Sequence, residues 1–405
     1  MEKGNGQRIY KWAMLTLIIV ILTSLITAFA TYQYLNTEGK ASFSKEPTTL
    51  NGLEYTLSKF RSEFEKKYIG EINDEDLING AIKGYVAALG DPYTCYYTKD
   101  EMDEIMEETN GNYVGIGIYM TLDKEKNAIT IIKPMEDSPA EKAGLLPGDI
   151  ITKVDGQGYS GSEMDEASNR IKGESGTKVT LEILRGTETK TFEITRKKVL
   201  ISHIETKILQ NNIGYIAISD FDGGCAEEFK RKYEELAKKG INKLIIDIRN
   251  NGGGIVDEAI DIADLITEKN ATLLITKDKE NEEEITRAKS NPIIKMPVVI
   301  LTNGYSASAS EILAGALKDN EKATLVGTTT YGKGVIQELR RLSDGSGLKI
   351  TTNEYFTPKH STINKTGIKP DVEIDLSDEA KAKLQLTEEE DTQLQKAIEV
   401  LKSKN

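Results

Sequence analysis

Three short segments carry residue types that could perform acyl-transfer chemistry. Their sequences are Asp-Ile-Arg-Asn-Asn-Gly-Gly-Gly (247–254), Ser-Ala-Ser-Ala-Ser-Glu (306–311) and Gly-Lys-Gly-Val-Ile-Gln (332–337). A serine between a strand and a helix can attack a carbonyl, and a glycine run at such a junction leaves N–H groups for the developing oxyanion. Taken singly, each segment also has an ordinary interpretation, as a turn, a set of N-caps or a solvated lysine.

The order and spacing of the three segments resemble the carboxyl-terminal processing proteases, from about residue 50 to the end of the chain. The resemblance implies that Ser308 is the nucleophile, Lys333 the general base and Gln337 the residue that orients the lysine. It places the oxyanion donors on the amides of Gly253 and Ala309, and it implies no metal or organic cofactor. Because lysine has an ordinary pKa of about 10.4, we expect Lys333 to be desolvated and free of carboxylate partners.

Histidine is the alternative general base. The chain has only two histidines, His203 and His360, so a histidine-rich metal site is excluded and a Ser-His-Asp triad would need one of them. Neither accompanies a Gly-x-Ser-x-Gly elbow. A net charge of −13 without a basic stripe argues against nucleic acid as the partner. A catalytically inactive PDZ-bearing scaffold that binds protein C-termini is the alternative function, and an acyl-CoA-type hydratase or hydrolase is a third.

The elements that must position these residues alternate between strand and helix after about residue 200. This pattern predicts an α/β core of βαβ type, and the family resemblance implies that it is crotonase-like. We expect strands at 214–219, 243–248 and 296–301, and helices at 229–238, 255–266 and 310–317. Flanking helices are expected at 73–89 and 387–401, the second opening on a Thr387-x-x-Glu390 capping box. In relatives such helices build a dimer, so a homodimer is a candidate assembly.

Residues 111–198 have the short strands, glycine turns and Pro147-Gly148-Asp149 motif that resemble a PDZ domain. PDZ domains bind a peptide C-terminus as an added strand and hold its carboxylate on backbone amides. The resemblance implies that the ligand site comprises Val114, Gly115, Ile116, Gly117 and Ile118. In some relatives a basic residue senses bound substrate; here either Arg170 or Lys172 could do so.

The apolar run Trp12–Tyr32 is long enough to cross a bilayer, and Lys3, Arg8 and Lys11 precede it. These features predict a single-pass anchor in the cytoplasmic membrane with the catalytic part outside. A signal peptide cleaved after Ala28-Phe29-Ala30 is the alternative, with secretion as the outcome.

The expected organisation is therefore an extracytoplasmic serine endopeptidase that cleaves near protein C-termini and is gated by its PDZ domain. Cys95 and Cys225 could pair only if they met in space. The expected segments are a cytoplasmic tail (1–11), an anchor (12–32), a linker (33–45), an N-terminal helical segment (46–110), a PDZ domain (111–198), a Ser-Lys protease core (199–375) and a C-terminal helical segment (376–405).

Overall fold

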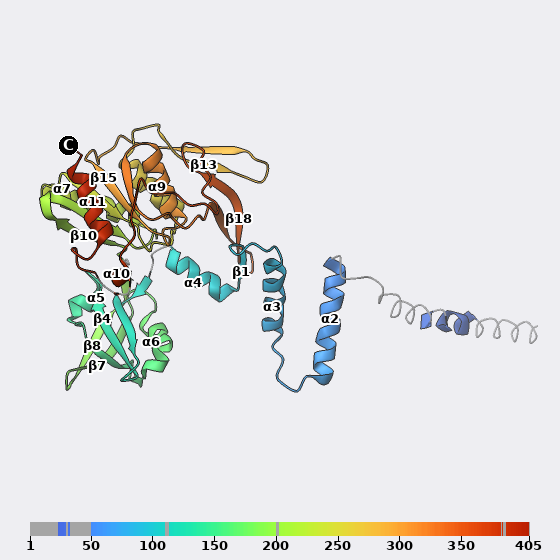
Figure 1. Ribbon diagram of the computed structural model, residues 1–405. Helices are drawn as coiled ribbons and strands as arrows, with labels where there is room; N and C mark the ends of the chain where they lie inside the picture. Colours follow the sequence, from blue (N-terminus) through green and yellow to red (C-terminus); the bar gives the residue numbers. More distant parts are fainter. Residues whose placement is uncertain are drawn as a thin grey trace, which may run out of the picture. The chain divides into compact units, whose positions relative to one another are not determined.

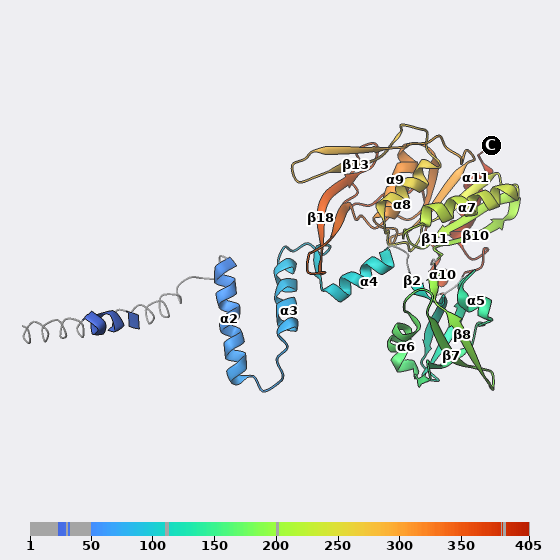
Figure 2. The same ribbon diagram turned by 180° about the vertical axis from the view of Figure 1, so that it is seen from behind.

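The computed structural model describes residues 23–29, 31–32, 50–109, 113–199, 202–381, 383 and 386–404. The chain divides into two compact units, Met1–Ile78 and Asn79–Asn405. The described part of the first unit contains α2 (Leu50–Lys67) and the start of α3 (Asp74–Ala87), joined by non-helical residues 68–73. The strands and the remaining labelled helices follow in the second unit (Figures 1 and 2).

The expected membrane anchor and linker lie mostly outside these described stretches. Residues 23–29 and 31–32 are helical, whereas most of Trp12–Tyr32 and all of 33–45 are not described. Within the described stretches, no helix combines the length and apolar character that a membrane crossing needs.

The centre of the second unit is a six-stranded sheet with the order β10-β11-β12-β15-β16-β19. The first pair is antiparallel and the later pairs are parallel. Continuous apolar runs in the central strands fit burial on both faces, as parallel strands require. The strands are β10 (Ile204–Leu209), β11 (Ile213–Ile218), β12 (Lys243–Asp247), β15 (Val298–Thr302), β16 (Ala323–Gly327) and β19 (Val372–Glu373).

Helices cover both faces of this sheet. Helices α7 (Cys225–Lys238), α8 (Val256–Asp264) and α9 (Ala309–Asp319) pack into one hydrophobic cluster with alternate strand residues. The other strand residues pack against α11 (Thr392–Lys402). The strand–helix alternation from β11 to β16 therefore has the βαβ form that the sequence indicates, and it brings the carboxyl ends of β12 and β15 side by side.

A second sheet, which the sequence analysis did not predict, stands beside the first in the protease core. Its order is β1-β18-β13-β14, and β17 also pairs with β18. It joins residues that precede the PDZ segment to residues near the end of the core. Its strands are β1 (Cys95–Tyr97), β13 (Thr272–Lys277), β14 (Glu283–Arg287), β17 (Val335–Arg341) and β18 (Gly347–Phe356), and α4 (Lys99–Thr109) follows β1.

The expected PDZ segment forms a separate sheet with its own hydrophobic cluster. The strand order is β3-β4-β5-β7-β8, so one side of β3 is an open edge in that sheet. The elements are β2 (Tyr113–Gly115), β3 (Ile118–Asp123), β4 (Ala128–Pro134), α5 (Pro139–Ala143), β5 (Ile150–Val154), β6 (Gln157–Gly158), α6 (Met164–Ile171), β7 (Lys178–Arg185), β8 (Glu188–Thr195) and β9 (Lys197–Val199).

The structure settles where the last helix begins and whether the two cysteines are paired. The prediction that the last helix begins at Thr387 is wrong, because α11 begins at Thr392 and Asp391 is its N-cap, accepting the Leu394 amide. A short helix α10 (Asp378–Lys381) precedes it. The question left open for the two cysteines is also answered: Cys95 and Cys225 are free thiols.

Candidate active site

Ser308 occupies the turn between β15 and α9, where it is the N-cap of the helix. Its backbone has φ 56° and ψ −116°, a conformation that costs a non-glycine residue about 1–3 kcal/mol and persists only where surrounding contacts enforce it. The side chain is partly exposed. The helix dipole and the first unpaired amides of α9 favour negative charge at this position.

The other two serines of the run have structural partners. Ser306 and Ser310 are fully buried, and their hydroxyls donate to the carbonyls of Ile248 and Asn251, at 2.8 and 3.0 Å. They fasten the nucleophile turn to the loop that follows β12. Of the three serines, Ser308 alone is accessible for attack on a substrate.

The glycine loop after β12 lies directly against Ser308. Gly253 has φ +115°, and a Cβ there would come within 2.7 Å of the Ser308 Cβ and 3.1 Å of the Ala309 nitrogen. Only glycine fits, so the two predicted oxyanion donors are neighbours. The Gly253 amide, however, donates to the Asn251 side chain at 2.8 Å and must leave this bond to reach an oxyanion.

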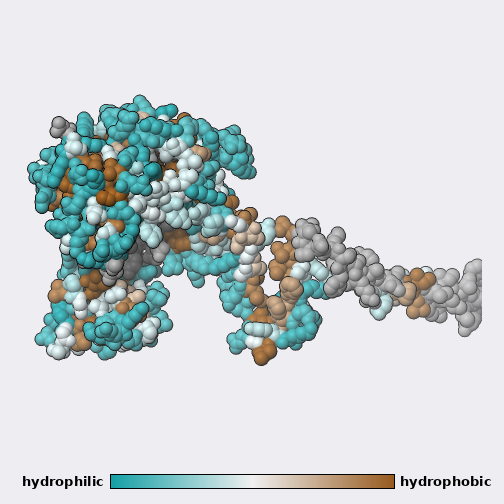
Figure 3. Space-filling view, in the orientation of Figure 1, coloured by the Kyte–Doolittle hydropathy of each residue, from teal (hydrophilic) through white to brown (hydrophobic). Residues whose placement is uncertain are grey.

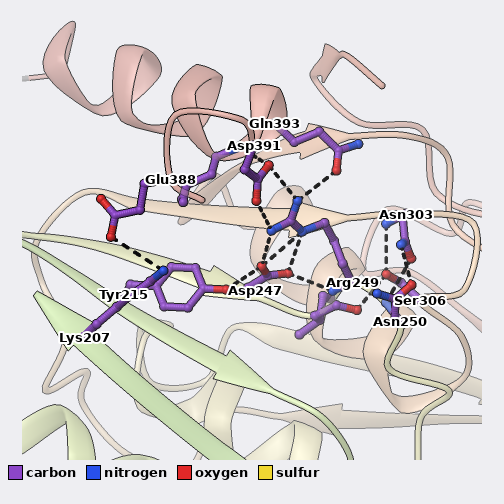
Figure 4. A network of polar contacts seen from close by, with 12 residues as sticks. Lys207, Tyr215, Asp247, Arg249, Asn250, Asn303, Ser306, Glu388, Asp391 and Gln393 are labelled. Carbon is purple, nitrogen blue, oxygen red and sulfur yellow. Dashed lines mark hydrogen bonds and ion pairs between the residues drawn. The ribbon is translucent and has the colours of Figure 1, made fainter. Parts of the chain in front are cut away.

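A polar network fixes the start of the same loop (Figure 4). The Arg249 guanidinium lies between Asp247 and Asp391, with shortest contacts of 2.6 and 2.8 Å, and also donates to Gln393. Burial alone would lower the pKa of Arg249, but the two carboxylates outweigh it and raise that pKa above its ordinary value. The network therefore ties α11 to the glycine loop.

Lys333 lies in the loop before β17, half-buried and without an ion-pair partner among the described residues. Its Nζ is 4.8 Å from the centre of the Tyr93 ring. Burial lowers the pKa of Lys333, and the charge of Lys349 lowers it further, while the carboxylates of Glu311 and Asp91 oppose the shift. This is the electrostatic setting that a neutral lysine base requires.

Glu311 connects the backbone of Ser308 to that of Lys333. Its fully buried carboxylate accepts the amide of Ser308 at 3.0 Å and that of Lys333 at 2.9 Å on the same oxygen, Oε2. The other oxygen accepts the Thr330 hydroxyl and the Gly332 amide at 2.6 and 2.7 Å. This role was not predicted from the sequence, although a glutamate three residues after an N-cap serine is a capping-box signal.

Tyr355 makes a second bridge between the same two residues. Its ring is fully buried, and its hydroxyl lies within hydrogen-bonding distance of the Ser308 carbonyl, at 3.1 Å, and of the Lys333 carbonyl. Burial raises the pKa of this tyrosine well above its ordinary value, so the hydroxyl stays a donor. No sequence signal pointed to it.

Gln337 lies within β17, close to the predicted base but bonded elsewhere. Its Nε2 donates to the Val335 carbonyl and the Thr351 hydroxyl, each at 3.3 Å. The described contacts of Gln337 include no hydrogen bond to Lys333. Lys333 lies in the loop before β17, whereas Gln337 lies within the strand.

Neither histidine contacts Ser308 in the described part of the chain. His203 Nε2 is 3.2 Å from Asp222 and its Nδ1 is 3.4 Å from the Ser219 hydroxyl. The nearby Asp222 carboxylate raises the pKa of His203. His360 is exposed in a turn after β18.

Of the predicted ligand residues of the PDZ segment, Ile118 begins β3, the edge strand of its sheet, and Ile116 and Gly117 directly precede it. Ile116 and Ile118 are buried in one cluster with Ala167 and Ile171 of α6. Gly117 has φ +76°, and a Cβ there would approach the Ser138 Cβ to 2.5 Å. Val114 and Gly115 lie in β2, where they pair with β9.

The two candidate sensing residues are at the end of α6. The Arg170 guanidinium is 3.7 Å from Asp155, and Lys172 is the C-cap. A third basic residue, Arg196, is buried and donates to the carbonyls of Arg170, Ile171 and Lys178. Arg196 fixes the helix end, and the geometry does not single out either candidate as a sensor.

Comparison with known proteins matches three parts of the chain. Residues 212–374 match Peptidase family S41, residues 130–185 a PDZ domain, and residues 21–101 the Activating protease CtpB N-terminal domain. A solved photosystem II D1 C-terminal processing protease is 32% identical, with a TM-score of 0.47, over 78% of this chain and 86% of that one. An S41 protease structure from Bacteroides fragilis shares the fold at 17% identity, with a TM-score of 0.52, over 83% of this chain and 91% of the other.

Similarity to curated relatives extends over almost the whole chain. It is 37% identical over 383 residues to a "Probable CtpA-like serine protease" of Staphylococcus aureus (strain MRSA252), covering 92% of this chain and 75% of the relative. A protein of the same description from Staphylococcus haemolyticus (strain JCSC1435) is 36% identical over 379 residues, with the same coverage. The chain therefore belongs to peptidase family S41 and is a C-terminal processing serine protease with a PDZ domain.

Proposed function

We propose that Ser308 and Lys333 form a Ser-Lys dyad that hydrolyses peptide bonds near protein C-termini. Neutral Lys333 takes the proton of the Ser308 hydroxyl as its oxygen attacks the scissile carbonyl. The lysine then gives that proton to the departing amine, which leaves an acyl group on Ser308. Water, deprotonated by the same lysine, releases the new C-terminus and restores the serine. No metal or organic cofactor is needed for these steps.

One observation carries this proposal: a single carboxylate oxygen of Glu311 holds the backbones of both residues. It supports a fixed separation between nucleophile and base, which matters because a displacement of 1 Å can cost about a hundredfold in rate. The amides of Gly253 and Ala309 would stabilise the oxyanion once Gly253 releases Asn251. Gln337 would orient the lysine after a side-chain rotation.

The PDZ domain would recognise the substrate's C-terminal tail and gate the site. The open edge of β3 supports addition of a peptide strand, with apolar side chains of the tail against Ile116, Ile118 and α6. Backbone amides of the loop at Gly115 and Gly117 would hold the terminal carboxylate. Substrate sensing would then pass through Arg170 or Lys172 at the end of α6.

We also propose how the protein is placed in the cell. The apolar run Trp12–Tyr32 would anchor it in the cytoplasmic membrane, with Lys3, Arg8 and Lys11 inside and the protease outside. Apolar side chains remain exposed along α2 and α3, including Leu57, Phe60, Phe64, Ile78 and Tyr85 (Figure 3). These faces favour a homodimer in which the helices of two copies cover each other. The core would be related to the crotonase fold.

The test is hydrolysis of peptides by the purified full chain in detergent micelles. Wild type should cleave tails ending in apolar residues, and Ser308→Ala and Lys333→Ala should each abolish turnover while the circular dichroism spectrum stays unchanged. The structure predicts that Ser306→Ala and Ser310→Ala instead lower thermal stability, because each loses a buried hydrogen bond. Tail binding without hydrolysis by the wild type would favour the inactive scaffold.

A further inference from the structure

The Tyr93 ring lies over the Lys333 amine, with 4.8 Å from Nζ to the ring centre, and residues 91–97, which carry this ring, are called here the cover segment. This segment precedes the PDZ domain and ends in β1, which pairs with β18. Asp91 accepts the amide of Tyr93 at 3.0 Å and the hydroxyl of Thr94 at 2.6 Å. These bonds fix the turn that carries the Tyr93 ring to the Lys333 amine.

The register of β1 places a second lysine beside the cover segment. Lys349 lies directly opposite Cys95 in the antiparallel pair, so the two side chains share a face of the sheet. Its Nζ is 5.6 Å from the centre of the Tyr97 ring. Lys349 is also two residues from Thr351, to which Gln337 donates, and therefore faces the same side as the predicted site.

We propose that the cover segment and Lys349 complete the general base: Tyr93 excludes water from the Lys333 amine, and Lys349 presents a second positive charge to it. Together they would set the lowest pH at which the protease works. This inference rests on the proposed role of Lys333 and adds two positioning residues to it.

The groups around the Lys333 amine act in opposite directions. The Tyr93 ring and the charge of Lys349 favour the neutral amine, one by excluding water and the other by repulsion. The carboxylates of Asp91 and Glu311 favour the ammonium. Burial raises the pKa of Tyr93, so its hydroxyl adds no negative charge beside the amine. Burial and repulsion prevail, so the pKa of Lys333 lies below its ordinary value.

Lys349 is suited to remain charged while Lys333 loses its proton. Burial opposes its charge, but the neighbouring Tyr97 raises the pKa of Lys349 above its ordinary value. Tyr97 is itself bonded to the Cys95 thiol at 3.0 Å. Among the described residues no carboxylate lies within ion-pair distance of Lys349, so its charge is not neutralised locally.

The experiment measures kcat/KM for a tail peptide, and the rate of phosphonylation of Ser308, from about pH 6 to about pH 10. Both should rise with pH as Lys333 loses its proton. Lys349→Gln should move the midpoint of this pH–rate profile upward by about 0.5–1 pH unit. Below the midpoint the rate should therefore fall about three- to tenfold, and at high pH it should equal that of the wild type. Lys349→Arg keeps the charge and should leave the midpoint in place.

Tyr93 provides an independent arm. Tyr93→Ala admits water to the amine and should also raise the midpoint, whereas Tyr93→Phe keeps the ring and should not. Lys279→Gln is the control for a lost surface charge, because Lys279 is exposed in the β13–β14 hairpin. Its profile should match that of the wild type.

The outcomes separate this inference from the proposed function. Full activity and labelling in Lys333→Ala would overturn the proposed dyad, and the inference with it. If Lys333 is essential but the midpoints of Lys349→Gln and Tyr93→Ala equal that of the wild type, the dyad stands and the inference is wrong. A fall in the midpoint of Tyr93→Ala would also overturn it, because the ring would then be stabilising the ammonium.

Discussion

Replacing Glu311 by glutamine should separate the two halves of the active site. The carboxylate accepts four donors, two on each oxygen. An amide can accept on only one side, so whichever way the substituted side chain is oriented, its NH₂ group faces two donors. Each lost charge-assisted bond is worth about 1.5–3 kcal/mol, and we expect a net loss of about 3–5 kcal/mol in unfolding free energy.

The assay combines urea denaturation with hydrolysis of a tail peptide in urea-free buffer, under conditions where the variant is folded. Since the Ser308 and Lys333 backbones would no longer share one anchor, turnover per folded molecule should fall about a hundredfold or more. Glu163→Gln is the matched control: Glu163 is also a capping-box glutamate, bonded to Ser160, but it is exposed in the PDZ domain. Glu163→Gln should lower the unfolding free energy by less than about 1 kcal/mol and leave turnover unchanged. Wild-type stability and turnover in Glu311→Gln would refute the bridging role.

Three further predictions concern the base, the C-terminal helix and the PDZ loop. Lys333→Met should raise the unfolding free energy near neutral pH by about 0.5–2 kcal/mol, because it removes a charge that is costly to bury. Since the pKa of Lys333 is lowered in the folded state, this gain in stability is full below the folded pKa and vanishes as the pH rises to the ordinary lysine value. Urea denaturation at two pH values tests whether the gain falls with rising pH. Asp391→Ala removes both the N-cap of α11 and a partner of buried Arg249, and it should lower the unfolding free energy by about 2–4 kcal/mol. Asp391→Asn keeps a capping oxygen and should lower it less. Equal melting temperatures for these variants and the wild type would contradict the proposed stabilising role of the network. The wild-type protein should bind tails with a free carboxylate about five- to thirtyfold more tightly than amidated tails. Gly117→Ala should remove this preference, because its methyl group would displace the loop. If calorimetry finds equal affinities for free and amidated tails in the wild type, carboxylate capture is excluded.

The sequence predicted those parts of the site that depend on neighbours along the chain. The serine run, the glycine loop and the lysine lie at strand–helix or loop positions whose local composition is informative, and the structure brings Ser308, Gly253 and Ala309 together. The βαβ alternation was readable for the same reason, because apolar strands and amphipathic helices differ in period.

What the sequence could not provide are contacts between distant segments. Tyr93 reaches Lys333 only because β1 pairs with β18, and the mixed polar strands of that sheet lack the alternation of a half-buried strand. Tyr355 is one of seventeen tyrosines, with no motif around it. The sequence before the last helix contains two possible N-caps. The amide of Thr387 donates to Glu390, but these residues form a turn before the helix. Asp391 caps the helix, and its carboxylate also accepts a hydrogen bond from Arg249.

In the proposed mechanism Ser308, activated by Lys333, forms the covalent intermediate. This can be measured by intact-protein mass spectrometry after brief exposure to an aryl fluorophosphonate near neutral pH, followed by peptide mapping. We expect one adduct per wild-type chain, located on Ser308, and none in Ser308→Ala or Lys333→Ala. An adduct on Ser219 beside His203, or undiminished labelling of Ser308 in Lys333→Ala, would contradict it.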